Sequence, residues 1–268
     1  AHARRNRRGD WNDQMMKYDV KDCKLLQKRE LAKDIFDFVV EAPDFAAAAQ
    51  AGQFAHIYVP GKTLRRPISI CGVDRAAGTL RFVFQIRGEG TRMLAGLEEG
   101  ATLDILAPLG HGFVLGDCSR KALFVGGGIG VPPLLEASKA FGKNATAVLG
   151  FRNRDAVILE EDFRANGCEV RIATDDGSMG HHGLVTDCLK DLDFDVLFAC
   201  GPTPMLKAVC AVAKERGVEC QISLEERMAC GIGACLGCAC KLLADGREYF
   251  GHVCKDGPVF PYQNVVLD

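Results

Sequence analysis

The spacing of cysteines near the C-terminus restricts the fold of this chain more than any other feature. Four residues separate Cys230 from Cys235, two separate Cys235 from Cys238, and Cys254 follows later. This is the spacing with which plant-type ferredoxins bind a [2Fe-2S] cluster. The glycines between these cysteines permit positive φ angles and a close approach of the backbone to an inorganic core. The motif therefore predicts that Cys230, Cys235, Cys238 and Cys254 bind a [2Fe-2S] cluster.

A hairpin is expected to bring the fourth cysteine back to the other three. Asp245-Gly246 is a strong signal for a two-residue turn, and folding the chain about it places Cys254 within about one residue of a position opposite Cys238. Cys240 fits no step of the motif and is interpreted as a packed thiol. The alternative is a zinc-stapled interaction protein, but zinc sites usually combine two Cys-x2-Cys pairs and only one is available here.

Composition excludes several other classes of protein. The thirteen cysteines are hard to explain as disulfides without an export signal, because the cytoplasm keeps thiols reduced, so metal ligation in a cytoplasmic protein is expected. The net charge of -2 gives no reason to expect nucleic acid as a partner. No apolar run is long enough to span a membrane. Residues 1–15 contain an arginine cluster in a polar stretch and are predicted to form a disordered tail.

Hydrophobic patterning divides the remaining chain into three parts. Residues 16–110 contain short runs of β-forming residues separated by Gly and Pro turns, which predicts a small antiparallel β-barrel or sandwich. Residues 118–222 alternate between strand and helix patterns, which predicts a parallel α/β domain. Residues 223–268 are too few for a core of their own and carry the clustered cysteines, as expected of a module that a metal site stabilises.

Two segments of the predicted barrel indicate a flavin site. Arg66, Pro67, Ile68 and Ser69 begin a strand; a guanidinium suits a diphosphate, and a Ser hydroxyl can bond a flavin ring nitrogen. Taken alone, a surface arginine beside a strand-starting proline explains this segment better. The turn that contains Gly90 and Thr91 then leads into a helix, whose free N–H groups favour a phosphate. Together the two segments are moderately specific for a flavin-binding barrel.

A glycine-rich turn in the α/β region indicates a dinucleotide site. Gly126, Gly127, Gly128 and Gly130 follow a buried strand and precede two prolines that suit the first turn of a helix. The turn departs from the G-x-G-x-x-G fingerprint, because Val131 stands where the third glycine belongs. Four glycines, three of them consecutive, favour a nucleotide-binding loop over an ordinary tight turn.

Two further strand ends carry candidate residues. Asp175 and Asp176 follow a later strand. A carboxylate there would accept hydrogen bonds from an adenosine ribose and repel a 2′-phosphate, so NAD is preferred to NADP as the cofactor. The alternative is an acidic turn with no ligand. Cys200 closes another strand at the same predicted edge. It is a candidate catalytic residue beside the nicotinamide, and a buried strand-end thiol is nearly as good an interpretation.

Read in order, these motifs resemble one family. They include Arg-Pro-Ile-Ser, Gly-Gly-Gly-Ile-Gly-Val-Pro-Pro, Cys-Gly-Pro-Thr-Pro-Met and Leu-Glu-Glu-Arg-Met-Ala-Cys-Gly-Ile-Gly-Ala-Cys. The chain resembles the electron transfer subunits of B-type dihydroorotate dehydrogenases, within the ferredoxin reductase superfamily. The resemblance implies an N-terminal FAD-binding antiparallel β-barrel, a Rossmann-like parallel α/β NAD domain and a small C-terminal [2Fe-2S] domain. It also implies FAD contacts at Arg66, Pro67, Ile68, Ser69, Val83, Phe84, Gln85, Gly90 and Thr91.

The resemblance further implies a partner and a reaction. The partner would be an FMN-containing dihydroorotate dehydrogenase catalytic subunit, two of each forming a heterotetramer in pyrimidine biosynthesis. Electrons would pass from that FMN through the cluster to FAD and leave as hydride to NAD+, with FAD converting single electrons into pairs. A related subunit of a ferredoxin-linked NAD(P)H oxidoreductase or a sulfide dehydrogenase is the close alternative, although such subunits tend to have Asp where Cys230 stands here.

Overall fold

The N-terminal part of the chain is a closed antiparallel barrel. The computed structural model describes residues 18–267, so the predicted tail at residues 1–15 lies outside the described residues. The strands of the barrel follow the order β1-β2-β5-β4-β3-β6. Their bounds are β1 (Asp19–Ala32), β2 (Ile35–Glu41), β3 (Phe54–Ile57), β4 (Arg66–Asp74), β5 (Thr79–Gln85) and β6 (Thr102–Leu109), with the short helices α1 (Pro43–Ala48) and α2 (Glu89–Ala95) between them.

Alternation of side chains along the barrel strands fills its interior. Phe38 and Phe82 are fully buried, and Phe84 meets Phe38 edge to face with ring centroids 5.0 Å apart. Val83, between Phe82 and Phe84, points outward instead and packs against the neighbouring α/β part. This period of two is what the β-forming runs of the sequence predict. Strand β6 ends at Leu109, next to residue 110, where the sequence pattern of the barrel ends.

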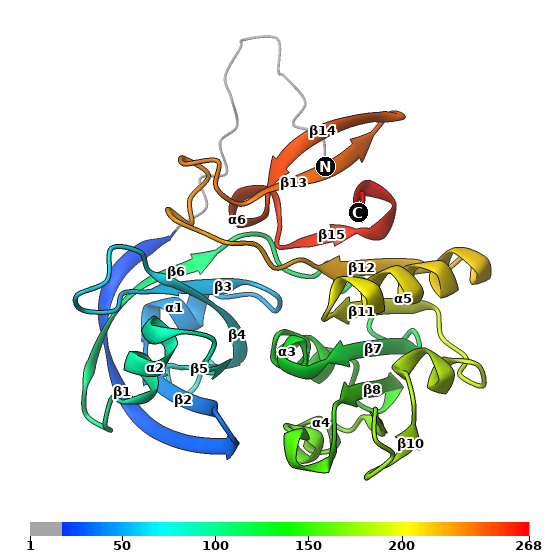
Figure 1. Cartoon of the computed structure of the whole chain (residues 1–268), viewed down its shortest axis with the longest axis horizontal. Coiled ribbons are helices and arrows are strands. Elements are labelled where there is room, and N and C mark those ends of the chain that lie inside the picture. The colour runs from blue at the N-terminus through cyan, green and yellow to red at the C-terminus, as the bar shows by residue number, and fades with distance from the viewer. Residues whose placement is uncertain (1–17, 268) are drawn as a thin grey trace.

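The middle of the chain forms a mainly parallel sheet in the order β10-β9-β8-β7-β11-β12-β15. Figure 1 shows helices α3 and α4 between this sheet and the barrel, and α5 on the other side. Short 3-10 helices η1 (Gly128–Gly130), η2 (Gly142–Asn144), η3 (Arg154–Ala156) and η4 (Val185–Leu189) connect the elements. The bounds are β7 (Ala122–Gly127), α3 (Pro132–Phe141), β8 (Ala145–Phe151), α4 (Glu160–Ala165), β9 (Glu169–Thr174), β10 (His181–His182), β11 (Val196–Cys200), α5 (Thr203–Arg216) and β12 (Glu219–Ser223).

The C-terminal part is a hairpin that lies over both larger parts (Figure 1). Its elements are β13 (Ala239–Ala244), β14 (Arg247–His252), α6 (Val253–Asp256), β15 (Val259–Pro261) and η5 (Tyr262–Asn264). Asp245 and Gly246 both have positive φ angles and form the predicted turn. Strand β15 pairs antiparallel with β12 and so completes the edge of the parallel sheet, which the sequence pattern did not predict.

A buried ion-pair network connects the barrel to the α/β part. Asp37 is 1% exposed and accepts hydrogen bonds from Arg29 Nη2 at 2.7 Å and from Arg81 Nε at 2.9 Å. Arg81 also pairs with Asp162, which lies on α4. A buried carboxylate loses its hydration, so these two guanidinium groups are needed to satisfy it.

We expect Asp37→Ala to lower the free energy of unfolding by about 3 kcal/mol, because it leaves the largely buried Arg81 with only part of its pairing. Urea unfolding followed by circular dichroism measures this change. The matched control is Asp44→Ala, which removes the partner of Lys21 at the surface of the same barrel and should change stability little. Equal effects of the two substitutions would contradict this account of the interface.

Candidate functional site

Backbone amides of the cysteine loop point at its sulfur atoms. Cys230 Sγ accepts the N–H groups of Ile232, Ala234 and Cys235 at 3.5, 3.3 and 3.4 Å. Cys254 Sγ accepts the N–H of Gly233 at 3.1 Å. Such donors stabilise negative charge on sulfur, which is the state in which cysteine binds a metal.

The four predicted ligands form two pairs of neighbouring thiols. Cys230 lies beside Cys235, and Cys238 lies beside Cys254. The second pair is buried, with Cys238 2% and Cys254 0% exposed, whereas Cys235 is exposed. Within residues 18–267, no three or more Cys, His, Asp or Glu side chains converge in the geometry of a single metal ion. Two thiol pairs with amides aimed at them match the two irons of a [2Fe-2S] cluster, each of which takes two thiolates.

The two pairs differ in their electrostatics. Burial raises the pKa of the Cys230 thiol, but hydrogen bonds from the Ile232 and Cys235 amides outweigh it and lower this pKa to about 6. Burial and the neighbouring Cys238 thiol raise the pKa of Cys254 to about 12. Burial likewise raises the pKa of Cys240, to about 11, and this thiol on β13 packs against the buried group that contains Cys238 and Cys254, in keeping with its interpretation as a packed thiol. Cys230, in the more exposed outer pair, is thus more easily deprotonated than Cys254, in the buried inner pair.

The cysteine loop rests on the barrel. Leu109 and Phe54 of the barrel share a buried cluster with Cys238, Cys254 and Leu242 of the C-terminal part. Beside this group of buried residues, the side chain of His56 on β3 is fully buried under the cysteine loop. Burial and the positive charge of the nearby Arg65 lower the pKa of His56 to about 4. The cluster-binding loop and the barrel therefore form one packed unit.

The two predicted flavin segments lie in contact. A Cβ atom at Gly90 would be 2.2 Å from Arg66 Nε, so the Arg66 side chain packs directly on the glycine of α2. The Thr91 hydroxyl accepts the N–H groups of Arg87 and Gly88 at 2.9 and 3.2 Å and donates to the Gly88 carbonyl. Thr91 is thus the third residue of α2, and its hydroxyl caps the first turn of the helix.

The remaining predicted flavin residues are distributed over two faces of the barrel wall. Ile68 and Phe84 point into the barrel core, and Val83 points toward the α/β part. Ser69, Pro67 and Gln85 are partly exposed. The side chains of Ile68 and Phe84 are therefore not available to a ligand on the outer surface, and the predicted contacts at all these positions stay predictions.

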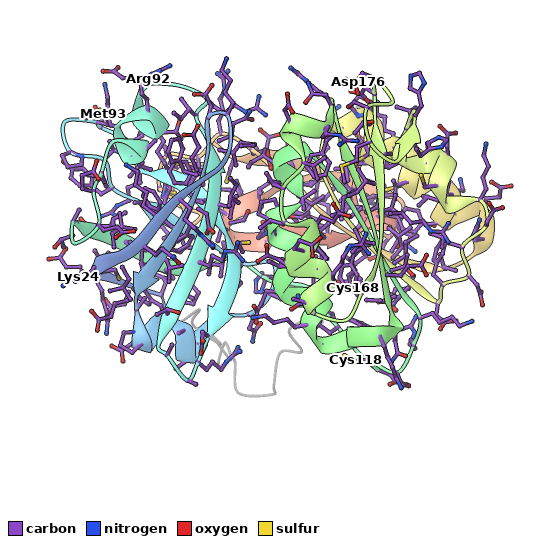
Figure 2. The ribbon with its side chains drawn as sticks, turned by 90° about the horizontal axis from the view of Figure 1, so that it is seen from below. Lys24, Arg92, Met93, Cys118, Cys168 and Asp176 are labelled. Carbon is purple, nitrogen blue, oxygen red and sulfur yellow. The ribbon has the colours of Figure 1, made fainter. Side chains whose placement is uncertain are left out.

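A cavity of about 740 Å³ lies where the barrel meets the carboxyl edge of the sheet. Gln85 of the barrel, three glycines of the turn and Asp175 all line this cavity. In Figure 2, Asp176 and the α2 residues Arg92 and Met93 lie at this end of the molecule, opposite Cys118. Other residues that line the cavity include Ile35, Arg87, Gly127, Gly128, Gly130, Arg152, Leu184, Thr186, Gly201, Pro202, Met205 and Glu225.

Close packing explains why the turn contains glycine. A Cβ atom at Gly130 would lie 2.5 Å from the carbonyl oxygen of Cys200, and one at Gly127 would lie 2.7 Å from Met205 Sδ. Gly128 has a φ of +54°, which favours glycine. Gly126 lies behind the turn against Val131 and does not line the cavity. Gly127, Gly128 and Gly130 therefore line the cavity with backbone atoms alone, and Ile129 between them adds an apolar side chain.

The other predicted dinucleotide residues divide into two groups. Asp175 lines the cavity, but the Asp176 carboxylate is engaged by the hydroxyl and the N–H of Ser178 at 2.6 and 2.9 Å. Cys200 is 1% exposed and does not line the cavity; burial raises its pKa well above the ordinary value. Its catalytic role stays a prediction, and what it presents toward the glycine turn is its carbonyl group.

Comparisons with known proteins agree with this geometry. Residues 225–266 match the family described as the iron-sulfur cluster binding domain of dihydroorotate dehydrogenase B. Electron transfer subunits of dihydroorotate dehydrogenase B (NAD(+)) from Bacillus cereus (strain B4264) and Bacillus mycoides (strain KBAB4) are 44% and 45% identical over 255 residues, which are 91% of this chain and 97% of each relative. The chain belongs to this family of electron transfer subunits.

Solved structures share the fold of this electron transfer subunit. One, from work on flavin-based electron bifurcation by the NADH-dependent reduced ferredoxin-NADP oxidoreductase, is 32% identical with a TM-score of 0.80, and the match covers 92% of this chain and 90% of that chain. The ferredoxin reductase in carbazole 1,9a-dioxygenase is 20% identical with a TM-score of 0.63, over 75% of this chain and 67% of that one. Among the described residues, no helix is long and apolar enough to cross a membrane.

Sequence reasoning missed two charged residues of the electron transfer subunit's cavity. Arg87 follows β5 and Glu225 follows β12, and both line the cavity. Partial loss of hydration among the surrounding atoms raises the pKa of Glu225, and the positive charge of Arg87 opposes this shift. A charged residue directly after a buried strand was the available signal, but the sequence does not show that the two strand ends face each other.

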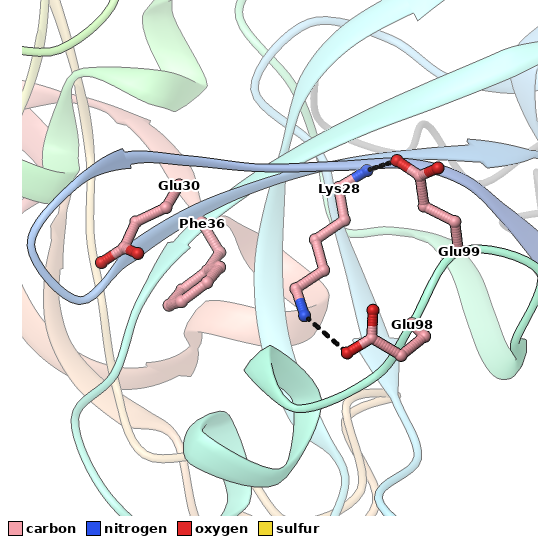
Figure 3. Close-up of a pocket in the computed structure, with 5 residues that line it drawn as sticks. All are labelled: Lys28, Glu30, Phe36, Glu98 and Glu99. Carbon is pink, nitrogen blue, oxygen red and sulfur yellow. Dashed lines mark hydrogen bonds and ion pairs between the residues drawn. The ribbon is translucent and has the colours of Figure 1, made fainter.

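A second depression, of about 490 Å³, lies on the barrel surface and shares no lining residue with the cavity described above (Figure 3). Lys28 spans it: its backbone N–H donates to Glu99 at 2.9 Å, and its ammonium lies 3.6 Å from Glu98 and 5.9 Å from the centre of the Phe36 ring. Its charged groups already have partners, because Lys28 pairs with Glu98 and the carboxylates of Glu99 and Glu30 accept backbone N–H groups. None of the predicted site residues lines it.

We expect Gly130→Ala to lower the free energy of unfolding by about 2 kcal/mol, because the added methyl group meets the Cys200 carbonyl. The same displacement of the turn should weaken NADH binding at least tenfold, measured by fluorescence titration. Gly96→Ala is the control: its φ of −80° suits alanine and its nearest neighbour would be 3.4 Å away. Unchanged NADH affinity in Gly130→Ala would show that this turn does not form the dinucleotide site.

Proposed function

We propose that this chain is the electron transfer subunit of an NAD-linked dihydroorotate dehydrogenase, and that it binds a [2Fe-2S] cluster, FAD and NAD. One observation carries the proposal: paired thiols under amide donors pack on the barrel at Phe54 and Leu109, and a nucleotide-sized cavity lies where the same barrel meets the sheet. The names of the 44% identical relatives, which this chain matches over 91% of its length, supply the reaction.

The chain's own residues account for holding each group. Cys230, Cys235, Cys238 and Cys254 supply four thiols, and the amides around them fit thiolate ligands. Arg66 over Gly90, with Ser69 on the same strand, supports binding of FAD along β4 and α2. When bound, a flavin supplies the exchange between hydride and single electrons that neither NAD nor an iron–sulfur cluster performs alone.

The cavity supports NAD as the co-substrate. Gly127, Gly128 and Gly130 line the cavity without side chains, so their backbone N–H groups would be within reach of a diphosphate. Asp175 is the carboxylate that lines the cavity and would accept ribose hydroxyls, while Asp176 is held by Ser178. Arg87 and Glu225 place one positive and one negative charge where the barrel and the sheet meet, so they can orient the two rings that exchange a hydride there.

The partner would be an FMN-containing catalytic subunit, with two of each chain in a cytoplasmic heterotetramer. Support comes from the uneven burial of the thiol pairs: Cys235 is exposed while Cys238 and Cys254 are buried on the barrel side. A bound cluster would thus have one side at the surface, open to a partner, and the other toward the flavin segments. The chain itself would not bind dihydroorotate.

A related role in a ferredoxin-linked NAD(P)H oxidoreductase is the second candidate, because the 32% identical structure comes from such an enzyme. The two roles differ in electron donor. Reduction of NAD+ by dihydroorotate in the complex with the FMN subunit, without added ferredoxin, supports the first; dependence on reduced ferredoxin supports the second.

We expect Cys235→Ser to abolish NAD+ reduction by dihydroorotate in the complex with the FMN subunit, since an exposed ligand of the outer pair is lost. Reduction of a dye by the FMN subunit should continue. Cys240→Ser is the matched control, because Cys240 is two residues from Cys238 yet is not in either pair, and its complex should keep at least half of the activity. Loss of activity in Cys240→Ser alone would contradict the ligand assignment.

A further inference from the structure

The imidazole of His56 is buried, and neither of its ring nitrogens has a hydrogen-bond partner among the described residues. It is 0% exposed, and within residues 18–267 its two ring nitrogens are the only buried side-chain nitrogen or oxygen atoms without a hydrogen-bond partner. A buried imidazole that lacks a partner is costly, because its N–H has given up water. An imidazole in so well packed a place needs a partner, and the backbone groups that lie close enough to act on it are those of Cys230 and Arg65.

The backbone of His56 is held firmly. Strand β3 lies between β4 and β6, where His56 pairs with Pro67 on one side and Leu106 on the other. Arg65 Nη1 donates to the His56 carbonyl at 3.2 Å. Nη2 of the same guanidinium donates to Oδ1 and Oδ2 of Asp104 at 2.8 and 3.0 Å. The imidazole therefore projects from a rigid part of the barrel, next to the strand that begins with the flavin segment.

The imidazole faces the first ligand of the cysteine loop. A Cβ atom at Gly231 would lie 2.6 Å from His56 Nδ1, and Gly231 has a φ of +74°. The Cys230 backbone also lies close enough to act on the ring as a hydrogen-bond acceptor. Any side chain at position 231 would displace either the ring or the loop, so the glycine and the histidine fit each other.

We propose that His56 is a positioning residue for the cluster: its ring N–H donates to the Cys230 backbone in the cluster-loaded protein and fixes the loop that carries Cys230. This inference rests on the proposed function. A neutral imidazole has one N–H donor and one acceptor nitrogen, and the Cys230 carbonyl is the acceptor nearest to it on the loop. The bond would connect the flavin-binding barrel to the ligand at the outer end of the cluster.

Such a bond has a measurable electronic consequence. Hydrogen bonds and dipoles around the sulfur atoms set the reduction potential of an iron–sulfur cluster. A donor close to Cys230 stabilises the more negative, reduced cluster, so its loss should make the cluster harder to reduce. Packing alone would not produce a shift that depends on the presence of a donor.

The test compares His56→Leu with His56→Asn in the FAD- and cluster-loaded chain. His56→Leu fills the space without a donor, and its cluster should become tenfold harder to reduce, a shift of about 59 mV to lower potential for one electron, with altered g-values in the electron paramagnetic resonance spectrum. His56→Asn places an amide near the position of Nδ1 and should restore most of the wild-type potential. The flavin potential serves as the internal control and should not move.

Equal cluster potentials in wild type and His56→Leu would overturn the inference, and so would equal shifts in the Leu and Asn variants. A measurement on the wild type covers the case in which His56→Leu does not fold. With 15N-labelled histidine, one imidazole should show resonances broadened by the reduced cluster and an N–H protected from exchange; absence of both would also overturn it. A wild-type protein without a cluster signal would instead contradict the proposed function.

Discussion

The contact between the cysteine loop and the barrel determines how the rest of the molecule is arranged. Phe54 and Leu109 pack against Cys238 and Cys254 in one buried cluster, and the loop closes over His56. Because this contact is buried, the inner thiol pair is packed beside the strands that carry the flavin segment. The hairpin β13–β14 and strand β15 then tie the same loop to the edge of the parallel sheet.

This arrangement gives one chain two kinds of site that meet at the barrel. The four thiols lie on one side, and the cavity lined by Gln85, Arg87 and the glycine turn lies on the other. Burial of Asp37 between Arg29 and Arg81 and the pairing of Arg81 with Asp162 hold the barrel against the sheet. A ligand in the cavity thus contacts two parts of the chain whose relative position is fixed by a desolvated ion-pair network.

Sequence reasoning succeeded where the signal was local. The cysteine spacing, the Asp245-Gly246 turn and the glycine turn each specify backbone geometry within a few residues, and the structure brings the predicted cysteines into two pairs. It did less well where a side chain's role depends on distant neighbours. The sequence could not distinguish Asp175 from Asp176, show that Cys200 is buried, or show that Glu225, Arg87 and His56 come together with the predicted residues, because tertiary packing decides each of these.

The central claim is that Cys230, Cys235, Cys238 and Cys254 hold a [2Fe-2S] cluster against a flavin-binding barrel. The most direct measurement is the iron, acid-labile sulfide and flavin content of the chain purified without oxygen, together with its absorption spectrum. The account predicts iron and labile sulfide in equal amounts, both lost in a Cys254→Ser variant that still binds FAD. Bound zinc without sulfide, or a colourless protein, would contradict it.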